Sequence, residues 1–236
     1  MKFIWAIATH PGLVRDSNQD SVLPTSGGTG PGPLLVAVAD GMGGHAGGEV
    51  ASRLAIETIV ADPDIPVNDR VVKANEVISA ESLADPVLAG MGTTVSVVEI
   101  QQDGAATIGH VGDSRVYLLR SGRLQQLTTD HTLVARWVAE GRLTQEQAAV
   151  HPQRSMLMRA VGHGRPLQVD VIEERLTDGD RLMICSDGLS GMINDELIFD
   201  LLSQGTAEES VWALVEAANR AGGHDNITVA AVDVES

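Results

Sequence analysis

"LLVAVADGMGGHAGGEVAS", residues 34–52, joins an apolar run to a carboxylate and then to a glycine-rich loop. Residues 34–39 are all apolar, which is typical of a buried strand. Aspartate is depleted inside strands, so we predict that the strand ends at Ala39 and presents Asp40 rigidly at its end. Five glycines then fall within eight positions, at Gly41, Gly43, Gly44, Gly47 and Gly48. We interpret them as close packing around a ligand, followed by a helix from about Gly48.

The length and composition favour one folded domain in a reducing compartment. The chain has 236 residues, and 43% of them are hydrophobic, which is enough for a core. The sequence contains no apolar run of the roughly 18 residues that span a membrane. The apolar start "MKFIWAIATHPG" lacks a small-residue cleavage site, so we interpret it as a first strand. A single cysteine, Cys185, excludes an intrachain disulfide, is interpreted as a core residue, and favours a cytoplasmic location.

Charge excludes two classes of partner. The chain has 32 acidic and 16 basic residues, for a net charge of −16. Nucleic acids and anionic membranes both need basic patches, so we expect neither as a partner. A phosphorylated substrate is still compatible with this charge, because bound cations would reverse the sign at one site.

The order of the apolar segments predicts an α+β fold. We predict strands at 3–8, 34–39, 93–100, 105–110, 115–119, 169–173, 181–185 and 227–232. Helical spacing is found at 47–61, 70–83, 133–140, 196–202 and 207–221. The runs between residues 93 and 127 are joined by short turns, which favours antiparallel pairing. The Gly/Pro-rich stretch 25–33 is predicted to be a hairpin loop.

Four aspartates occupy the same kind of position beside apolar strands: Asp40, Asp113, Asp187 and Asp225. Each alone could be an ordinary turn residue, but four such cases favour a shared site. Two carboxylates about 4 Å apart repel by ~4 kcal/mol at an effective dielectric near 20. Divalent cations would relieve that repulsion. All-oxygen ligands suit Mg²⁺ or Mn²⁺ rather than zinc, and the sequence has neither a CxxC nor an HExxH motif.

Motifs along the chain resemble one enzyme family. "GLVRDSNQD", "VADGMGGHAGGEVAS", "MGTT", "HVGDSRVYLLR", "TTDHTLV", "LMICSDGLS" and "GGHDNITV" follow one another in the order typical of metal-dependent Ser/Thr protein phosphatases, the PPM family. The chain is similar to the compact bacterial branch, from about Thr9 to Val232. The resemblance implies a four-layer α-β-β-α sandwich of two antiparallel sheets flanked by helices. It also implies a single domain, 1–236, with a flap subdomain at about 128–164.

The resemblance implies the ligands of two tightly bound Mg²⁺ or Mn²⁺ ions. Asp40 would bridge both ions, and the Gly41 carbonyl would bind the second. Asp187 and Asp225 would complete the first site. Asp20 would hold the second ion through water, and Gln19 stands beside it where many relatives have glutamate.

Further roles are implied for three residues. Asp113, with Asp187, would bind a weak third ion. Arg15 would bind the substrate phosphate, since its planar fork suits two oxygens; the alternative is a surface ion pair with Asp16 or Asp20. His45 would protonate the leaving oxygen or hold the glycine loop, because Met42 occupies the place where eukaryotic relatives have histidine. His163 and His224 are interpreted as structural.

The implied function is hydrolysis of phosphoserine and phosphothreonine in proteins by a metal-activated water. Expected partners are phosphorylated proteins, including a Ser/Thr kinase or its targets, and the expected state is a monomer. A phosphatase for a small metabolite is a rival within the same class. A catalytically inactive binding module is a rival from another class, and retention of the aspartates disfavours it. The glycine loop lacks the GxxxxGK[ST] pattern of a nucleotide-binding loop.

Overall fold

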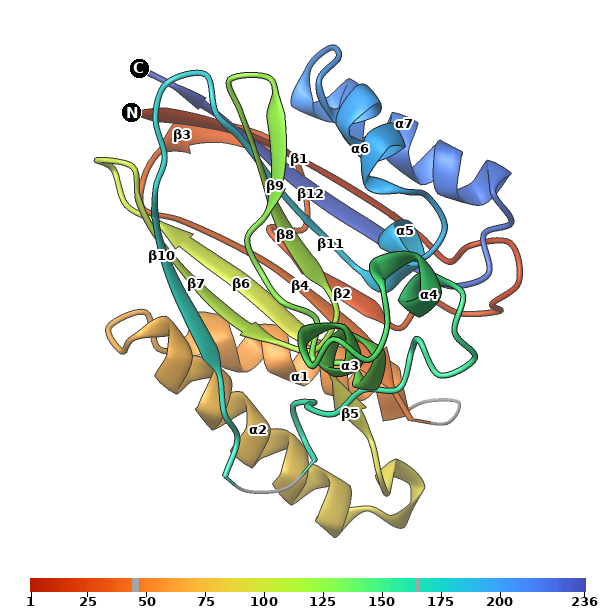
Figure 1. Cartoon of the computed structure of the whole chain (residues 1–236). Helices are drawn as coiled ribbons and strands as arrows, with labels where there is room; N and C mark the ends of the chain where they lie inside the picture. The colour runs from red at the N-terminus through yellow and green to blue at the C-terminus, as the bar shows by residue number, and fades with distance from the viewer. Residues whose placement is uncertain (44–46, 164–165) are drawn as a thin grey trace.

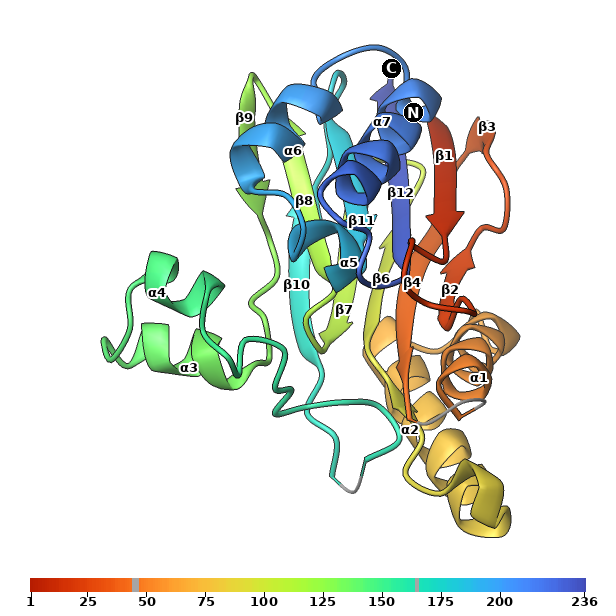
Figure 2. The same ribbon diagram turned by 90° about the vertical axis from the view of Figure 1, so that its right-hand side faces the viewer.

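Two antiparallel sheets pack face to face in the middle of the molecule (Figures 1 and 2). The structure is a computed structural model that describes residues 1–43, 47–163 and 166–236. The first sheet has the strand order β3-β1-β12-β11-β8-β9, and the second has the order β10-β7-β6-β4-β2 with the short β5 beside β4. The predicted α+β sandwich is therefore confirmed.

The strands of the first sheet come from both ends and the middle of the chain. They are β1 (Lys2–His10), β3 (Gly28–Pro31), β8 (Arg115–Arg120), β9 (Arg123–Gln126), β11 (Arg181–Cys185) and β12 (Ile227–Glu235). The second sheet contains β2 (Asp20–Leu23), β4 (Leu34–Met42), β5 (Gly92–Thr93), β6 (Val95–Ile100), β7 (Ala105–Val111) and β10 (Asp170–Arg175). β1 and β12 pair along their whole lengths, which places the two chain ends side by side.

Helices cover the outer face of each sheet. α1 (Gly47–Ala61) and α2 (Val67–Ala84) pack on the second sheet, and a short 3₁₀ helix, η1 (Pro86–Leu88), follows them. α5 (Asp187–Ser190), α6 (Asp195–Leu202) and α7 (Ala207–Arg220) lie on the first sheet. α3 (Leu133–Ala139) and α4 (Gln145–Ala149) stand to one side of the sandwich in Figure 2. None of the helices in the described ranges combines the length and apolar character needed to cross a bilayer.

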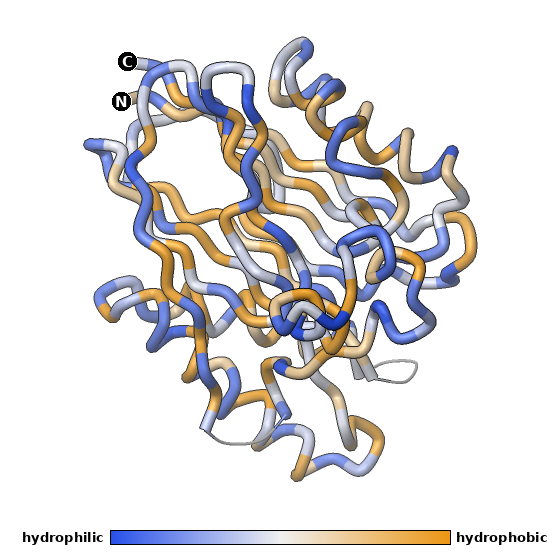
Figure 3. The backbone as a smooth tube through the Cα atoms, in the orientation of Figure 1, coloured by the Kyte–Doolittle hydropathy of each residue, from blue (hydrophilic) through white to orange (hydrophobic). Residues whose placement is uncertain are grey.

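The apolar run at 34–39 is explained by burial on both faces of β4. Val36 and Val38 point between the sheets, whereas Ala37 and Ala39 face α1 and α2. A strand covered on both faces reads as continuously apolar rather than alternating. The small alanines let the helices approach closely. In Figure 3 the strands accordingly carry long hydrophobic stretches, and the turns at their ends are largely hydrophilic.

β4 extends beyond its predicted end at Ala39. Asp40 pairs with Asp20 of β2, while Gly41 and Met42 pair with Thr93 and Gly92 of β5. Neighbouring strands on both sides therefore hold the aspartate. A strand interior accepts a carboxylate here because the side chain faces a cleft.

Two predicted connections differ from those observed. Stretch 25–33 does join antiparallel neighbours, β2 and β4, but it also contains β3, which pairs with β1 of the other sheet. The β6–β7 hairpin is antiparallel as predicted, whereas β7 and β8 belong to different sheets. β8 pairs instead with β9, a strand that the sequence analysis did not predict. The turn with Asp113 is therefore a crossing between sheets. It delivers that carboxylate to the end of the sandwich.

We predict that Ile108→Ala destabilises the protein by about 2–5 kcal/mol, because Ile108 is fully buried between the sheets and its removal leaves a cavity. Urea unfolding should show a lower midpoint at an unchanged slope. The control is Val171→Ala on the neighbouring strand β10, where the side chain is 48% exposed and the cost should stay under about 1 kcal/mol. Equal losses in the two variants would contradict the placement of the core.

Candidate metal centre

A cleft of about 690 Å³ opens at one end of the sandwich. All four aspartates singled out from the sequence line it, together with Arg15 and Gly41. They come from different elements: β4, the β7–β8 turn, the start of α5 and the residues before β12. Other lining residues are Val14, Asp16, Ser17, Gln19, Met42, Gly43, Thr94, Ser155, Leu157, His224 and Asn226. The fold therefore brings together the carboxylates that the sequence separates.

The backbone of Asp40 is fixed by two threonines. The Asp40 N–H donates to Thr94 Oγ1 at 3.0 Å, and the Thr94 N–H donates to the Asp40 carbonyl at 2.8 Å. Thr93 Oγ1 donates to the same carbonyl at 2.9 Å. The Thr94 hydroxyl also hydrogen-bonds that of Ser114, 2.7 Å away, beside Asp113. The "MGTT" motif therefore couples two of the aspartates, a role that sequence reasoning did not assign.

Glycine beside Asp40 permits close packing of backbone on backbone. A Cβ at Gly41 would lie 2.0 Å from the Gly48 carbonyl oxygen and 2.6 Å from that of Gln19. A Cβ at Gly48 would lie 2.7 Å from Gln19 Oε1. No side chain fits at either position, so the start of α1 rests directly against β4. This is the reason for glycine at these two positions: the close packing is of backbone on backbone, whereas the sequence analysis predicted packing around a ligand.

Asn226 connects the last aspartate to the loop that contains Arg15. Its N–H donates to Asp225 Oδ1 at 2.9 Å, and its Oδ1 accepts from the Gln19 N–H at 2.8 Å. Its amide nitrogen donates to the carbonyls of Pro11 and Ser17 at 2.9 and 2.8 Å. This buried amide was missed by sequence reasoning, although "HDN" was within a noted motif. It holds both ends of the 11–19 loop to β12.

Asp20 lies behind the cleft rather than on its wall. Its backbone faces Asp40 across the β2–β4 pair, and Ser186 Oγ donates to its Oδ2 at 2.8 Å. Its Oδ1 is buried without a hydrogen-bond partner in the structure. A buried polar atom of this kind calls for a water or an ion. Burial raises the pKa of Asp20 to about 7.

The carboxylates of the cleft raise one another's pKa values. Burial, followed by the charges of Asp20, Asp187 and other aspartates, raises the pKa of Asp40 well above its usual value. Burial and then the charge of Asp187 raise the pKa of Asp113 to about 8. The pKa of Asp187 is raised by burial and by Asp225. Such a cluster cannot ionise fully without added positive charge, and divalent cations supply it.

The residues present fit a divalent metal. The donors are hard oxygens, one of them unpartnered, and the glycine backbone leaves room beside them. Among the described residues, three or more acidic, histidine or cysteine side chains do not yet converge on one point.

Arg15 stands at the mouth of the cleft. Its guanidinium lies 2.7 Å from Asp225 Oδ2, and 56% of its side chain is exposed. This hydrogen bond raises the pKa of Arg15, followed by the Asp225 charge. The ion pair expected as the alternative, with Asp16 or Asp20, is replaced by one with a predicted metal ligand. Neutralisation of Asp225 by a cation would release the guanidinium for another anion.

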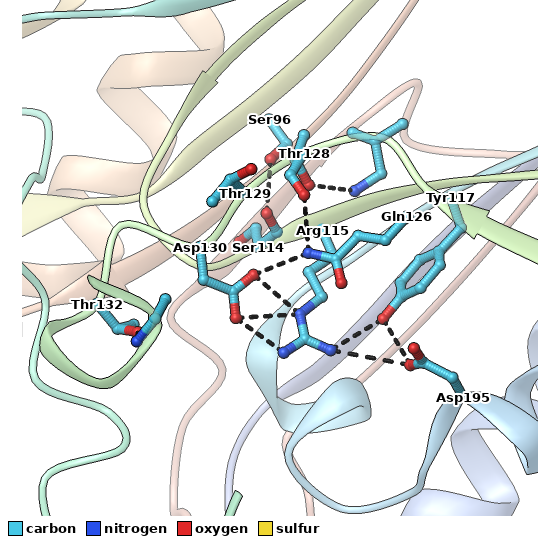
Figure 4. Close-up of polar contacts among 12 residues, drawn as sticks. Ser96, Ser114, Arg115, Tyr117, Gln126, Thr128, Thr129, Asp130, Thr132 and Asp195 are labelled. Carbon is cyan, nitrogen blue, oxygen red and sulfur yellow. Dashed lines mark hydrogen bonds and ion pairs between the residues drawn. The ribbon is translucent and has the colours of Figure 1, made fainter. Parts of the chain in front are cut away.

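An ionic network centred on Arg115 fixes the chain that follows the turn with Asp113 (Figure 4). Arg115 binds both oxygens of Asp130, at 2.8 to 3.2 Å, and donates to the Tyr117 hydroxyl at 2.9 Å. The Tyr117 hydroxyl donates to Asp195 Oδ1 at 3.0 Å, and Gln126 donates to Asp130. A bidentate arginine pair is geometrically specific. The "TTDHT" motif is thereby held against β8, beside the turn with Asp113.

His131 also helps to hold the 128–164 segment against the sheets. Its Nδ1 accepts from the Gly112 N–H at 3.0 Å, so its Nε2 carries the proton and lies 3.1 Å from Asp170. Arg159 binds the same carboxylate at 2.6 Å. The start of the 128–164 segment, its later part and β10 are therefore held together around one buried imidazole.

The histidine predictions have separate outcomes. His45 lies outside the described residues. His224, interpreted as structural, is exposed and lines the cleft. His163 is also exposed and lines a neighbouring cavity instead. Cys185 is fully buried, as expected of a core residue.

Residues 14–220 match the family model described as Protein phosphatase 2C. The chain belongs to the protein phosphatase 2C family. The serine/threonine protein phosphatase PstP of Mycobacterium tuberculosis is 44% identical over 98% of this chain, and the chain spans 45% of PstP's own length. Protein phosphatase PhpP of Streptococcus pneumoniae is 36% identical, covering 97% of this chain and 96% of PhpP.

Solved structures show the same fold. The crystal structure of M. tuberculosis PstP superimposes with a TM-score of 0.91 at 40% identity, covering 100% of both chains. The PstP catalytic domain in complex with two manganese ions gives a TM-score of 0.88 at 38% identity, again over 100% of both chains. The family resemblance inferred from the motifs is thus confirmed.

We predict that this protein, when free of metal, loses thermal stability as the pH rises from 6.5 to 8.5. The folded-state pKa values of Asp20 and Asp113 are about 7 and 8, well above the unfolded value of 3.8. In this window the folded state binds more protons than the unfolded state, so stability falls as pH rises. His110 and His131, with lowered pKa, act in the opposite direction, but only until unfolded histidine, half protonated at pH 6.5, loses its remaining proton by about pH 7.5. The loss from the two aspartates extends further, since the pKa of Asp113 is about 8.

Calorimetric melting in EDTA at the two pH values measures this effect. Saturating Mn²⁺ should flatten the loss, because a cation takes the place of the bound protons. A metal-free melting temperature that rises over this window would show that the carboxylates are ionised without metal.

Proposed function

We propose that this chain hydrolyses phosphoserine and phosphothreonine in proteins with the help of two Mg²⁺ or Mn²⁺ ions. The observation that carries the proposal is the convergence of four buried or partly buried aspartates from four elements on one cleft, with an arginine at its mouth. The names of PstP and PhpP, and the two manganese ions of the PstP catalytic domain, support it.

We assign the metal ligands as follows. Asp40 bridges the two ions, because it is at the centre of the cluster and its pKa responds to all four other aspartates. Asp187 and Asp225 complete the first site, and the Gly41 carbonyl serves the second. Asp20 reaches the second ion through a water, which fits its position behind the wall and its unpartnered oxygen.

The bound ions would activate a water and screen the charge of the phosphoryl group. The remaining work belongs to the protein. Arg15 exchanges Asp225 for the phosphate and fixes its orientation with two parallel hydrogen bonds. Thr93, which donates to the Asp40 carbonyl, keeps Asp40 in place during turnover. Asn226, whose N–H donates to Asp225, does the same for Asp225.

Asp113 is proposed as the main ligand, with Asp187, of a weak third ion. It is 8% exposed and lines the cleft, and its pKa responds most to Asp187 after burial. A site with two protein carboxylates would be filled mainly by water and would exchange readily. His45 remains the proposed proton donor to the leaving oxygen, and exposed His224 is a second candidate because it lines the cleft.

The wider predictions also belong to this proposal. Residues 128–164, with α3 and α4, are proposed as a flap subdomain of a single domain, 1–236. Phosphorylated proteins, including a Ser/Thr kinase or its targets, are the proposed substrates. A monomeric state and a cytoplasmic location stay predictions.

A panel of phosphopeptides, phosphorylated metabolites and p-nitrophenyl phosphate, assayed with Mg²⁺, Mn²⁺ or EDTA, tests the function. We expect metal-dependent hydrolysis with phosphopeptides preferred over metabolites. The reverse preference would make the protein a metabolite phosphatase. Absence of hydrolysis of any substrate with metal present would make it an inactive binding module.

Asp40→Asn should abolish activity and leave the fold intact. An amide offers one neutral acceptor oxygen where the bridge needs two charged ones. Turnover of p-nitrophenyl phosphate should fall below about a tenth of wild type while circular dichroism stays unchanged. The control is Asp103→Asn, at the opposite end of β7, which should keep full activity. Retained turnover in Asp40→Asn would remove this residue from the bridging position.

Arg15→Ala should impair substrate use and spare metal binding. Loss of a charge-assisted phosphate contact costs about 1.5–3 kcal/mol, or roughly 10- to 150-fold in kcat/KM. Titration calorimetry with Mn²⁺ should give an affinity equal to or higher than that of wild type, because Asp225 loses a competing partner. Arg53→Ala, at an exposed pair on α1, is the control. Weaker metal binding at an unchanged KM would assign Arg15 to the metal scaffold.

A further inference from the structure

A second cavity, of about 540 Å³, adjoins the metal cleft. The two cavities share three lining residues, Met42, Ser155 and Leu157. The second one, here called the side groove, extends from them between Met42 and two stretches of the described chain, residues 157–163 and 166–168. Anything bound at the metals can therefore continue into the side groove.

One wall of the side groove is fixed by backbone hydrogen bonds. The Met158 N–H donates to the His131 carbonyl at 2.7 Å, and the Leu133 N–H donates to the Met156 carbonyl at 2.9 Å. Three residues further on, Val161 and Thr93 exchange both backbone bonds, at 2.8 and 2.9 Å. The stretch between these anchors is held in place before any ligand arrives, which lowers the entropic cost of binding.

The opposite wall is tied to the same anchor. Met42 pairs with Gly92, the residue before Thr93. β5 therefore joins both walls, and the width of the groove is set by strand pairing.

Apolar side chains form slightly more than half of the lining of the side groove. Met158 is 47% exposed, and Leu157, Leu167, Pro166 and Met42 complete its apolar surface. Exposed neighbouring apolar residues often mark a binding surface. Methionine suits such a surface because its unbranched, polarisable side chain adapts to different partners.

Charge favours this side of the cleft for an anionic ligand. Residues 128–164 contain four arginines and three acidic residues, whereas the whole chain has 16 basic and 32 acidic residues. A phosphopeptide approaching a protein of net charge −16 is therefore repelled less along this segment than by the chain as a whole. Arg159, on the wall of the groove, is one of these arginines.

We propose that the side groove binds an apolar side chain of the phosphoprotein substrate, close in sequence to the phosphorylated residue. The inference rests on the proposed function, and it names the substrate class that the site selects. The two cavities share walls, and an extended peptide advances about 3.3 Å per residue, so the selected side chain lies within about three residues of the phosphate.

Peptide binding provides the test. The probes are fluorescent peptides of glycine and serine with a central phosphonate analogue of phosphoserine, which is not hydrolysed. Each carries one leucine at one of the three positions before or after the centre, and a peptide without leucine is the reference. Anisotropy titration in Mn²⁺ should find a position where leucine tightens binding roughly tenfold.

Two methionines provide a matched pair of variants. Met158→Gln should remove most of this preference, because Met158 lines the groove. Met156 is equally exposed, at 48%, but does not line either cavity, so Met156→Gln should keep it. Met158→Leu should retain it as well. A wild-type protein indifferent to leucine, or equal effects of the two glutamine substitutions, would overturn the proposal.

Hydrolysis of p-nitrophenyl phosphate separates the two proposals. This substrate has no peptide to enter the groove, so Met158→Gln should hydrolyse it at the wild-type rate. If the protein prefers leucine-containing peptides but hydrolyses no substrate, the side-groove proposal is supported and the phosphatase function is rejected. If the protein hydrolyses phosphopeptides but shows no preference for leucine, the phosphatase function is supported and the side-groove proposal is rejected.

Discussion

Repulsion among carboxylates at one end of the sandwich is the constraint on which the rest of the site depends. The charges of neighbouring aspartates, added to burial, raise the pKa of Asp40, Asp113 and Asp187. Placing such groups together costs folding free energy unless protons or cations neutralise them. A protein bears that cost only where its backbone holds the carboxylates firmly. The sandwich supplies that hold through strands paired on both sides of β4 and through Asn226, which ties the start of β12 to both ends of the 11–19 loop.

The rigidity of the site comes from neutral groups more than from charged ones. Thr93 and Thr94 bind the backbone of Asp40, and the Asn226 amide bridges Asp225, Pro11, Ser17 and Gln19. All of these bonds except the one to the Asp225 carboxylate involve backbone groups of the held residues, so they do not depend on whether the aspartates are protonated or ionised. The charged Arg15–Asp225 pair is different, since in the proposed mechanism the metal would compete for Asp225 and the substrate phosphate would compete for Arg15. In the proposed mechanism the neutral hydrogen bonds would therefore hold the site in place, and the Arg15–Asp225 ion pair would exchange partners during catalysis.

Much of the fold could be predicted because apolar periodicity reports burial directly. The helix at 47–61 has the predicted bounds, and the four aspartates do line one cleft. Strand ends were harder to predict. β4 continues through Asp40 because β2 and β5 pair with it there, and pairing partners cannot be seen in a local sequence pattern. The β7–β8 crossing was missed for the same reason, since a short turn looks alike whether it joins neighbours or sheets.

Within the site, the candidate metal-binding carboxylates could be predicted from the sequence, but the residues that hold them in place could not. A carboxylate beside glycine after an apolar run is an unusual pattern, whereas Asn226 and Thr94 are ordinary polar residues until their partners are known. The side groove has no local signature at all. Its walls come from β4 and from residues more than a hundred positions later, and only strand pairing through β5 makes them neighbours.

The pairing of β1 with β12 has a consequence for how the molecule can be attached to anything else. His10 and Ile227 face each other near the cleft, and Lys2 and Glu235 face each other at the far end of the same ladder. That end is roughly 26 Å away at the rise of an extended strand. A tether at either terminus would therefore leave from a single point behind the sandwich. The mouth of the cleft, at the opposite end of the sandwich, would then face away from the point of attachment.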